Sequence, residues 1–439
     1  MEFRLRDYCY PISIYRFRRF LEKTQWMSPD ELHDWRLEKL RAVIKHAYDN
    51  VPLYQRKFNA QGVHPDDIRE FDDISRLPFL SKDEVRSNFD LLTAQSAARY
   101  RPVLSKTSGS TGTPLQFYND QSSSILEFAM LWRHWNWGGY RFGNRFCDLK
   151  AHIVKSKRGW EFDPRLNNIY LSAFHLSDDY MARYVKILKL LRPKILRGFP
   201  YSIDIFARWL LERGESAVEF KSVITNAETL FPHQRKNIEK AFRCKVLDAY
   251  GQIERTSYIF QCAHSTYHVM LEGGLLEIID ENGNEVGEGE CGEIVGTSFH
   301  NMAMPFIRYR TRDLCVKRSK ECPCGRNTPT VENIVGRVED IIITPEGNQV
   351  GYMDGAFFEV KGIRFAQIVQ EQIDLIRVKL VRDPDFDESE LEGLTVQLRK
   401  RLGPSMIIDY QFVEDVERTQ RGKAKTVISK ISPNIDHPV

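Results

Sequence analysis

The clearest chemical signal in the sequence is a short run of small hydroxyl residues and glycines. It reads Ser105-Lys106-Thr107-Ser108-Gly109-Ser110-Thr111-Gly112-Thr113-Pro114. Glycines allow a backbone to fold closely around an anion, and N–H groups and hydroxyls can then donate to phosphate oxygens. The run lacks the Gly-Lys-Ser/Thr ending of a Walker A loop. It therefore predicts a phosphate-binding loop of another type, with a flexible connector as the alternative.

Thiol and imidazole side chains form a second candidate site. Cys322 and Cys324 flank one proline, and Cys262 and His268 precede them, with His264 as an alternative to His268. Three thiolates and one imidazole make a closed tetrahedral site for structural Zn²⁺. The Cys-x-Cys spacing is shorter than usual, so metal-free cysteines remain the alternative. The other cysteines are isolated, and none has an obvious activating histidine.

Five segments in this order resemble the motifs of the adenylate-forming superfamily. After the 105–114 run come Asp248-Ala249-Tyr250-Gly251-Gln252-Ile253-Glu254, Ile307-Arg308-Tyr309-Arg310-Thr311-Arg312-Asp313, Gly336-Arg337-Val338-Glu339-Asp340 and Arg421-Gly422-Lys423-Ala424-Lys425-Thr426. Their order along the chain is more specific than any single motif. The chain as a whole resembles the group of phenylacetate–CoA ligases and CapK-like (coenzyme F390 synthetase-like) proteins, and the stretch 32–54 resembles its CapK-like branch.

The resemblance implies a site for ATP and Mg²⁺. The phosphates would be held by Ser108, Gly109, Ser110, Thr111, Gly112 and Thr113. Glu254 would bind Mg²⁺, which neutralises phosphate charge, and Tyr250 would lie near the adenine. Asp248 and Gly251 belong to the same nucleotide-binding segment, in which Ile253 replaces the usual threonine.

Further nucleotide contacts follow from the same resemblance. Asn226, Ala227 and Glu228 resemble the loop that lines the adenine and acyl pockets. Asp313 would accept hydrogen bonds from the ribose hydroxyls, although Arg312 stands where the family has glycine.

The hinge and the catalytic lysine are implied near the C-terminus. Arg337 would contact the nucleotide, and Glu339 or Asp340 would be the pivot for rotation of a small domain. Lys423 is the candidate catalytic lysine, a preorganised donor to charge in the transition state. Lys425 competes with it for this role.

Elements that position these residues can be read from periodicity and breaker residues. Ser28-Pro29-Asp30-Glu31 is a helix start signal, and helices are expected over 28–50 and 121–137. Short buried strands are expected at 223–225 and 245–247 with a helix between them, and longer strands at 269–280 and 290–299, joined by a turn at Asn282-Gly283. This mixture predicts an α/β fold.

The resemblance and the change of texture near residue 340 together predict two domains. A large N-terminal adenylate-forming domain, residues 1–338, has mixed sheets and helices, a helical arm at 1–60 and the zinc candidate around 262–324. A small mobile α+β domain, residues 339–439, carries the lysine. Its expected elements are strands at 341–343, 363–370, 375–381 and 407–412 and a helix at 388–402.

Composition limits the functional classes. The 439 residues are 42% hydrophobic and 28% charged with a net charge of +3, which is typical of a soluble globular protein and gives no support for nucleic-acid binding. No apolar run is long enough to span a bilayer, and no secretory signal is evident, so a cytoplasmic location is expected. The arginines and aromatics of Met1–Phe20 fit either an arm packed on the main domain or peripheral contact with the inner face of the membrane.

The expected reaction is ATP-dependent activation of a small-molecule carboxylic acid as its acyl-AMP, followed by transfer. The 32–54 resemblance favours a CapK-like ligase of capsule or surface-polysaccharide biosynthesis, whose acceptor is a sugar amine or hydroxyl. The alternative acceptor is coenzyme A, as in phenylacetate–CoA ligases, and a non-catalytic nucleotide-binding regulatory protein is a second alternative. The acyl pocket is expected near 131–137 or 198–202, and a homodimer is a candidate assembly.

Overall fold

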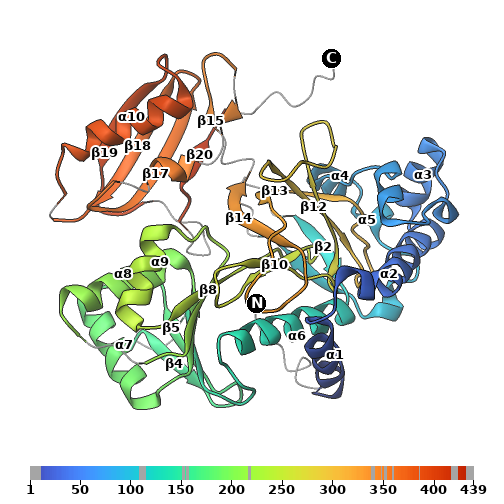
Figure 1. The fold of residues 1–439 in the computed structure, drawn as a ribbon, viewed down its shortest axis with the longest axis horizontal. Helices are drawn as coiled ribbons and strands as arrows, with labels where there is room; N and C mark the ends of the chain where they lie inside the picture. The colour runs from blue at the N-terminus through green and yellow to red at the C-terminus, as the bar shows by residue number, and fades with distance from the viewer. Residues whose placement is uncertain are drawn as a thin grey trace.

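The chain forms a large lobe on a twelve-stranded mixed sheet and a small lobe on a four-stranded sheet. Figure 1 shows this arrangement in a computed structural model, with the small lobe in orange and red beside the green helices α8 and α9. The structure describes residues 11–107, 115–150, 154, 158–215, 219–337, 342–347, 349–350, 353–357, 360–384, 386–416 and 424–431. The predicted α/β fold with a large and a small lobe is confirmed.

The first part of the chain is helical. Its helices are α1 (Pro11–Thr24), α2 (Pro29–Asn50), α3 (Pro52–Gln61), α4 (Lys82–Ser87) and α5 (Phe89–Leu92), with 3₁₀ turns at Pro65–Asp67, Phe71–Arg76 and Ala97–Tyr100. The start signal at Ser28 is confirmed, since Glu31 N–H donates to Ser28 Oγ and Ser28 N–H donates back to Glu31.

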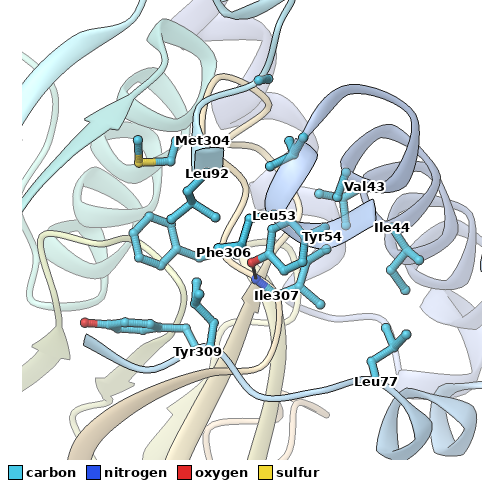
Figure 2. Close-up of a cluster of buried hydrophobic side chains, with 14 of the residues drawn as sticks. Val43, Ile44, Leu53, Tyr54, Leu77, Leu92, Met304, Phe306, Ile307 and Tyr309 are labelled. Carbon is cyan, nitrogen blue, oxygen red and sulfur yellow. Dashed lines mark hydrogen bonds between the residues drawn. The ribbon is translucent and has the colours of Figure 1, made fainter. Parts of the chain in front are cut away.

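The N-terminal helices pack against the segment that leads into the third motif. Figure 2 shows part of this core, with Leu53, Tyr54, Phe306 and Ile307 among its members. Tyr54 hydroxyl donates to the carbonyl of Pro305 at 3.0 Å and accepts from the N–H of Ile307 at 2.9 Å. These bonds fix the backbone just before Tyr309.

The large sheet has a parallel half and an antiparallel half. Its order is β11-β12-β13-β14-β10-β9-β8-β7-β6-β3-β5-β4. The half that contains the parallel strands consists of β3 (Phe146–Lys150), β4 (Trp160–Asp163), β5 (Asn168–Ser172), β6 (Ile195–Gly198), β7 (Ser222–Asn226) and β8 (Lys245–Gly251), with β4 antiparallel at the edge. The other half consists of β9 (Tyr258–Gln261), β10 (Tyr267–Val269), β11 (Gly274–Ile279), β12 (Cys291–Ser298), β13 (Tyr309–Lys317) and β14 (Thr330–Arg337).

Helices cover both faces of the parallel half. α7 (Asp178–Leu191), α8 (Pro200–Glu212) and α9 (Pro232–Phe242) share one core with alternate residues of the strands. α6 (Gln121–Trp137) packs on the opposite face. Leu21 of α1 lies in the same core as α6, so the described part of the arm is packed on the large lobe. Among the helices in the described residues, none is long and apolar enough to cross a membrane.

The small lobe has its own core. Its sheet runs β19 (Ile407–Phe412), β18 (Leu375–Arg382), β17 (Ile363–Gln372) and β20 (Val427–Ser429), and α10 (Glu390–Leu402) packs on it. A short pair, β15 (Ile342–Ile343) and β16 (Gln349–Val350), and a 3₁₀ turn at Met353–Ala356 precede the sheet. The large sheet ends with β14, and residues 338–341 lie outside the described part.

Most predicted elements are confirmed, with one correction. The strand expected over 269–280 is two strands, since β10 ends at Val269 and β11 begins at Gly274. The turn between them carries Glu272, whose carboxylate pairs with the buried guanidinium of Arg133 at 2.6 Å. The turn that carries this buried carboxylate interrupts the strand, which alternation of residue types does not reveal.

Candidate functional site

Three of the motif segments meet where β8, β13 and β14 come together. Tyr250 hydroxyl, at the end of β8, donates to Asp313 Oδ2 on β13 at 2.8 Å. Asp313 is in register with Arg337 of β14. The second, third and fourth motifs are therefore neighbours in space, although they lie far apart in the sequence.

Glu254 is a buried carboxylate beside this cluster. Its exposed fraction is 5%, and Tyr309 hydroxyl donates to its Oε1 at 3.0 Å. Burial raises the pKa of Glu254, and the charge of Lys82 acts in the opposite direction. A buried carboxylate of this kind gains from a nearby cation, so Glu254 fits the role of a Mg²⁺ ligand.

Arg255 fixes the backbone that carries Glu254. It has a left-handed φ of 60°, and its guanidinium pairs with Glu127 of α6 at 2.6 Å and donates to Ser124 Oγ at 2.8 Å. The ion pair is almost fully buried. Neither Arg255 nor Glu127 was predicted from the sequence, because their link spans more than a hundred residues and has no local pattern.

The candidate phosphate loop connects two strands beside Glu254. β1 (Val103–Lys106) and β2 (Gln116–Asn119) form a hairpin, and its end is closed by hydrogen bonds of 2.9 Å between Thr107 and Leu115 in both directions. Asn119 Nδ2 donates to Ser105 Oγ and to the carbonyl of Ile253, both at 3.0 Å. The hairpin that flanks the loop sequence is thus anchored next to Glu254, through the carbonyl of Ile253.

The loop after β7 lies beside the same strand. Asn226 is in register with Ala249 of β8, and Ala227 has a left-handed φ of 71°. Asn226 Oδ1 is buried and, among the described residues, has no hydrogen-bond partner. Glu228 accepts from the N–H of Tyr201 at 3.4 Å and from the N–H of Ala424 in the small lobe at 3.2 Å.

Asp248 lies deeper in the sheet than the other candidates. Its oxygens accept from Thr225 hydroxyl at 2.6 Å and Tyr267 hydroxyl at 2.8 Å, and burial raises its pKa. Because both oxygens are engaged inside the protein, this carboxylate is suited to positioning β8.

The four predicted metal ligands form a cluster. Cys262, His268, Cys322 and Cys324 place their ligand atoms within 4.8 Å of one another. The sulfurs of Cys262 and Cys322 are 3.6 Å apart, and Cys324 Sγ is 3.4 Å from His268 Nε2. Atoms around a tetrahedral Zn²⁺ lie about 3.5–3.8 Å apart, given metal–ligand distances of about 2.0–2.3 Å. The cluster therefore fits structural zinc.

The surroundings of the cluster orient its histidine. Thr328 Oγ1 lies 3.1 Å from His268 Nδ1, which leaves Nε2 toward the cysteines, as is usual for a metal-bound imidazole. Burial, assisted by Arg326, lowers the pKa of His268 to about 4, so the ring is neutral at pH 7 and able to bind a cation. His264 is exposed and lies outside the cluster.

The middle of the aromatic run 131–137 is used for packing in the core. Trp135 packs with Tyr140 and Phe146, and Arg133 and His134 are buried. Trp137 lies edge-on to His268, with ring centroids 6.0 Å apart, and forms one wall of the metal cluster. The role of this run in an acyl pocket stays a prediction.

Comparisons with known proteins agree with this geometry. The CapK C-terminal domain family matches residues 342–430. Protein CapK of Staphylococcus aureus is 27% identical over 82% of this chain and 80% of its own length. Phenylacetate-coenzyme A ligase of Escherichia coli (strain K12) is 26% identical over 74% of this chain and 75% of its own.

A solved enzyme shares the fold across both lobes. The crystal structure of 2-hydroxyisobutyryl-CoA ligase in the postadenylation state has a TM-score of 0.73 at 20% identity and covers 92% of this chain and 91% of its own. The same enzyme in the thioesterification state has a TM-score of 0.58 at 21% identity, with coverage of 92% and 91%.

The small lobe matches the CapK C-terminal domain family, and the chain as a whole is similar to CapK and phenylacetate–CoA ligases, which supports the adenylate-forming superfamily. Within it, the chain falls in the branch of phenylacetate–CoA ligases and CapK-like proteins, and it is an enzyme of the AMP-forming ligase class. The resemblance seen in the sequence is confirmed.

Arg312 stands where this superfamily has glycine, and the structure shows what that position requires. Arg312 has a left-handed φ of 66°, which glycine adopts without strain. The register of β12 and β13 shifts there, between Glu293 and Val295. Glu293 stabilises the shift, since its Oε1 accepts from Arg312 N–H at 2.9 Å. The altered residue thus keeps the turn that brings Asp313 to Tyr250.

Several predicted site residues lie outside the described part of this ligase. They are Ser108, Gly109, Ser110, Thr111, Gly112, Thr113, Glu339, Asp340 and Lys423. Arg337 is described only by its place in β14. The roles assigned to these residues remain predictions.

Removal of the Tyr309 hydroxyl tests how Glu254 is positioned. The Tyr309 ring packs on Phe306, with ring centroids 4.9 Å apart. Tyr309→Phe keeps this ring contact but removes a hydrogen-bond donor to Glu254. Hydrogen bonds to charged groups contribute about 1.5–3 kcal/mol, so we expect roughly tenfold slower pyrophosphate release at low Mg²⁺, partly restored at high Mg²⁺. Titration of the rate against Mg²⁺ measures this. Tyr54→Phe, in the same core, should change stability without changing the Mg²⁺ dependence, and equal Mg²⁺ curves for both variants would contradict the assignment.

Proposed function

We propose that this chain uses ATP to convert a small-molecule carboxylic acid to its acyl-AMP and then transfers the acyl group to an acceptor. The observation that carries the proposal is the meeting of Tyr250, Glu254 and Asp313 beside the hairpin of the candidate phosphate loop. A fixed carboxylate for the ribose, a buried carboxylate for the cation and a glycine-rich loop for phosphate are the parts that a nucleotide site needs.

In the proposed first half-reaction, a carboxylate oxygen of the substrate bonds to the α-phosphorus of ATP as the bond to pyrophosphate breaks. Glu254 would hold Mg²⁺, whose positive charge offsets the charge on the leaving pyrophosphate. Asp313 would accept from the ribose hydroxyls and so fix the distance between nucleotide and acid. Most of the acceleration would come from positioning and charge stabilisation.

The small lobe would supply Lys423 to this step. What supports this is the next residue, Ala424, whose backbone N–H donates to Glu228 on the loop after β7. We propose that the lobe, residues 339–439, moves between half-reactions about Glu339 or Asp340. Arg337 would contact the nucleotide just before this hinge.

For the acceptor we favour a sugar amine or hydroxyl, as expected of a CapK-like ligase of surface-polysaccharide biosynthesis. The match of the small lobe to the CapK C-terminal domain supports this choice. Coenzyme A is the second candidate, because phenylacetate-coenzyme A ligases are similar to this chain to the same degree.

We also propose that Cys262, His268, Cys322 and Cys324 hold a structural Zn²⁺. Four protein ligands leave no open position for a substrate. Arg326, next to the cysteine turn, lies 4.0 Å from the ring centre of Trp137 and 5.0 Å from that of Trp26. The metal would therefore hold the connection between β13 and β14 against α6 and against the turn between α1 and α2.

The test of this function is pyrophosphate release across a panel of carboxylic acids, with capture of labelled acyl groups on coenzyme A or on sugar acceptors. Lys423→Ala should lower acid-dependent release by roughly 10²-fold, as expected for loss of one transition-state donor. Lys425→Ala is the matched control and should retain most of the rate if Lys423 is the catalytic lysine, since alanine keeps the backbone carbonyl that accepts from Gln367 within the small lobe. Loss of activity in Lys425→Ala alone would reverse the assignment, and absence of release with every acid would favour a nucleotide-binding regulatory protein.

A further inference from the structure

Helix α8 has a second face that contacts the small lobe. Ile203, Phe206 and Leu210 pack into the core of the large lobe. Tyr201, Ile205 and Arg208 follow one another at intervals of four and three residues, so they share another face of the helix. Tyr201 and Arg208 on this face both make polar contacts with small-lobe residues.

Arg208 makes an ion pair across the lobes. Its Nη1 lies 3.1 Å from Asp383 at the end of β18, and its Nε lies 3.0 Å from Asp204 on its own helix. Asp383 Oδ1 also forms an ion pair with Arg364 of β17, whose Nε lies 2.5 Å away. The side chains of Arg208 and Asp383 are 14% and 22% exposed, so water screens the pair less than it screens a surface pair.

Tyr201 makes a second contact across the lobes. Its hydroxyl donates to Asp415 Oδ1 at 3.0 Å. Its ring lies edge-on to Phe365, with centroids 4.6 Å apart, within an apolar cluster that includes Val381 and Val416. A cleft of about 440 Å³ borders these residues and is lined by both lobes, so salt can reach the interface.

These contacts set the orientation that brings Ala424 to Glu228. The arrangement of the two lobes is closer to the postadenylation state of 2-hydroxyisobutyryl-CoA ligase than to its thioesterification state, with TM-scores of 0.73 and 0.58. We propose that Tyr201, Arg208, Asp383 and Asp415 form a latch that holds the small lobe in the acyl-adenylate-forming orientation and must open before acyl transfer. This inference rests on the proposed function, and the four residues act by positioning the lysine segment.

Asp383→Asn tests the latch with two measurements on the full chain. Small-angle X-ray scattering should show a wider distribution of interdomain distances than in the wild type, corresponding to a roughly tenfold shift in the ratio of open to closed lobes. Single-turnover pyrophosphate release should slow in proportion to the loss of closed population, by at most the same factor. Transfer of the acyl group from supplied acyl-AMP should stay as fast or become faster, a split that general destabilisation would not produce.

The matched control is Arg213→Gln at the C-cap of the same helix. Arg213 pairs with Asp178 within the large lobe at 2.5 Å, so this variant should match the wild type in scattering and in both half-reactions. Tyr201→Phe keeps the ring contact and removes only the bond to Asp415, and it should shift the ratio in the same direction if Asp383→Asn does not fold. Unchanged scattering, or equal slowing of both half-reactions, would overturn the latch. If the wild type released no pyrophosphate with any acid, the proposed function would fail while scattering still decided the latch.

Discussion

Replacement of Glu254 by glutamine is expected to lower the rate of pyrophosphate release by roughly 10³-fold, the upper end of the effect of removing one charge-stabilising group. Glutamine has the same shape and can still accept from Tyr309 hydroxyl, so the fold should be kept. The variant loses the negative charge that would hold Mg²⁺, and the charge of Lys82 then repels a cation. Pyrophosphate release measured over a range of Mg²⁺ concentrations reports the loss.

Glu285→Gln is the control for this prediction. Glu285 is an exposed carboxylate that pairs with Lys317 at 2.7 Å, and its neutralisation should leave the rate unchanged. If the Glu254→Gln variant released pyrophosphate at the wild-type rate at every Mg²⁺ concentration, the cation would be held elsewhere.

Loss of the metal cluster is expected to have the largest effect on stability. Cys322→Ser should remove bound zinc and lower the free energy of unfolding by about 4 kcal/mol, since loss of a metal is among the few changes that cost this much. The melting temperature should then fall by roughly 5 °C or more. Metal analysis of the purified chain should give one zinc per chain for the wild type and none for the variant.

Cys291→Ser provides the matched comparison. Cys291 is exposed and lies on β12, outside the cluster, so its replacement should change neither zinc content nor melting temperature. A wild-type chain that purifies without zinc and melts at the same temperature as Cys322→Ser would show that the cysteines are metal-free.

Local signals in the sequence predicted the elements well. The capping box at Ser28 and the turn at Gly283, with its φ of 85°, are set by a few adjacent residues. The bounds of α6 agree with the range predicted from its sequence. Motif order placed Tyr250, Glu254 and Asp313 in one site, and the structure brings these three together.

Contacts between distant segments could not be predicted. The pair of Arg255 with Glu127 and that of Arg133 with Glu272 join buried charges from separate elements, and nothing near either residue marks its partner. The interface face of α8 was also missed, because Tyr201 lay in a segment interpreted as pocket lining and its actual partner is Asp415. These features depend on which distant residues pair inside the protein. The spacing of apolar residues predicts which face of an element is buried, but not the residues that it contacts.

The central claim is that segments scattered along the chain surround a single nucleotide. Hydrogen–deuterium exchange of the wild-type chain with α,β-methylene ATP and Mg²⁺ tests it without requiring turnover. We expect slower exchange, on addition of the analogue, at 103–119, 226–228, 250–254 and 309–313 together. Protection of only one of these segments, or of none, at a saturating concentration of the analogue would contradict it.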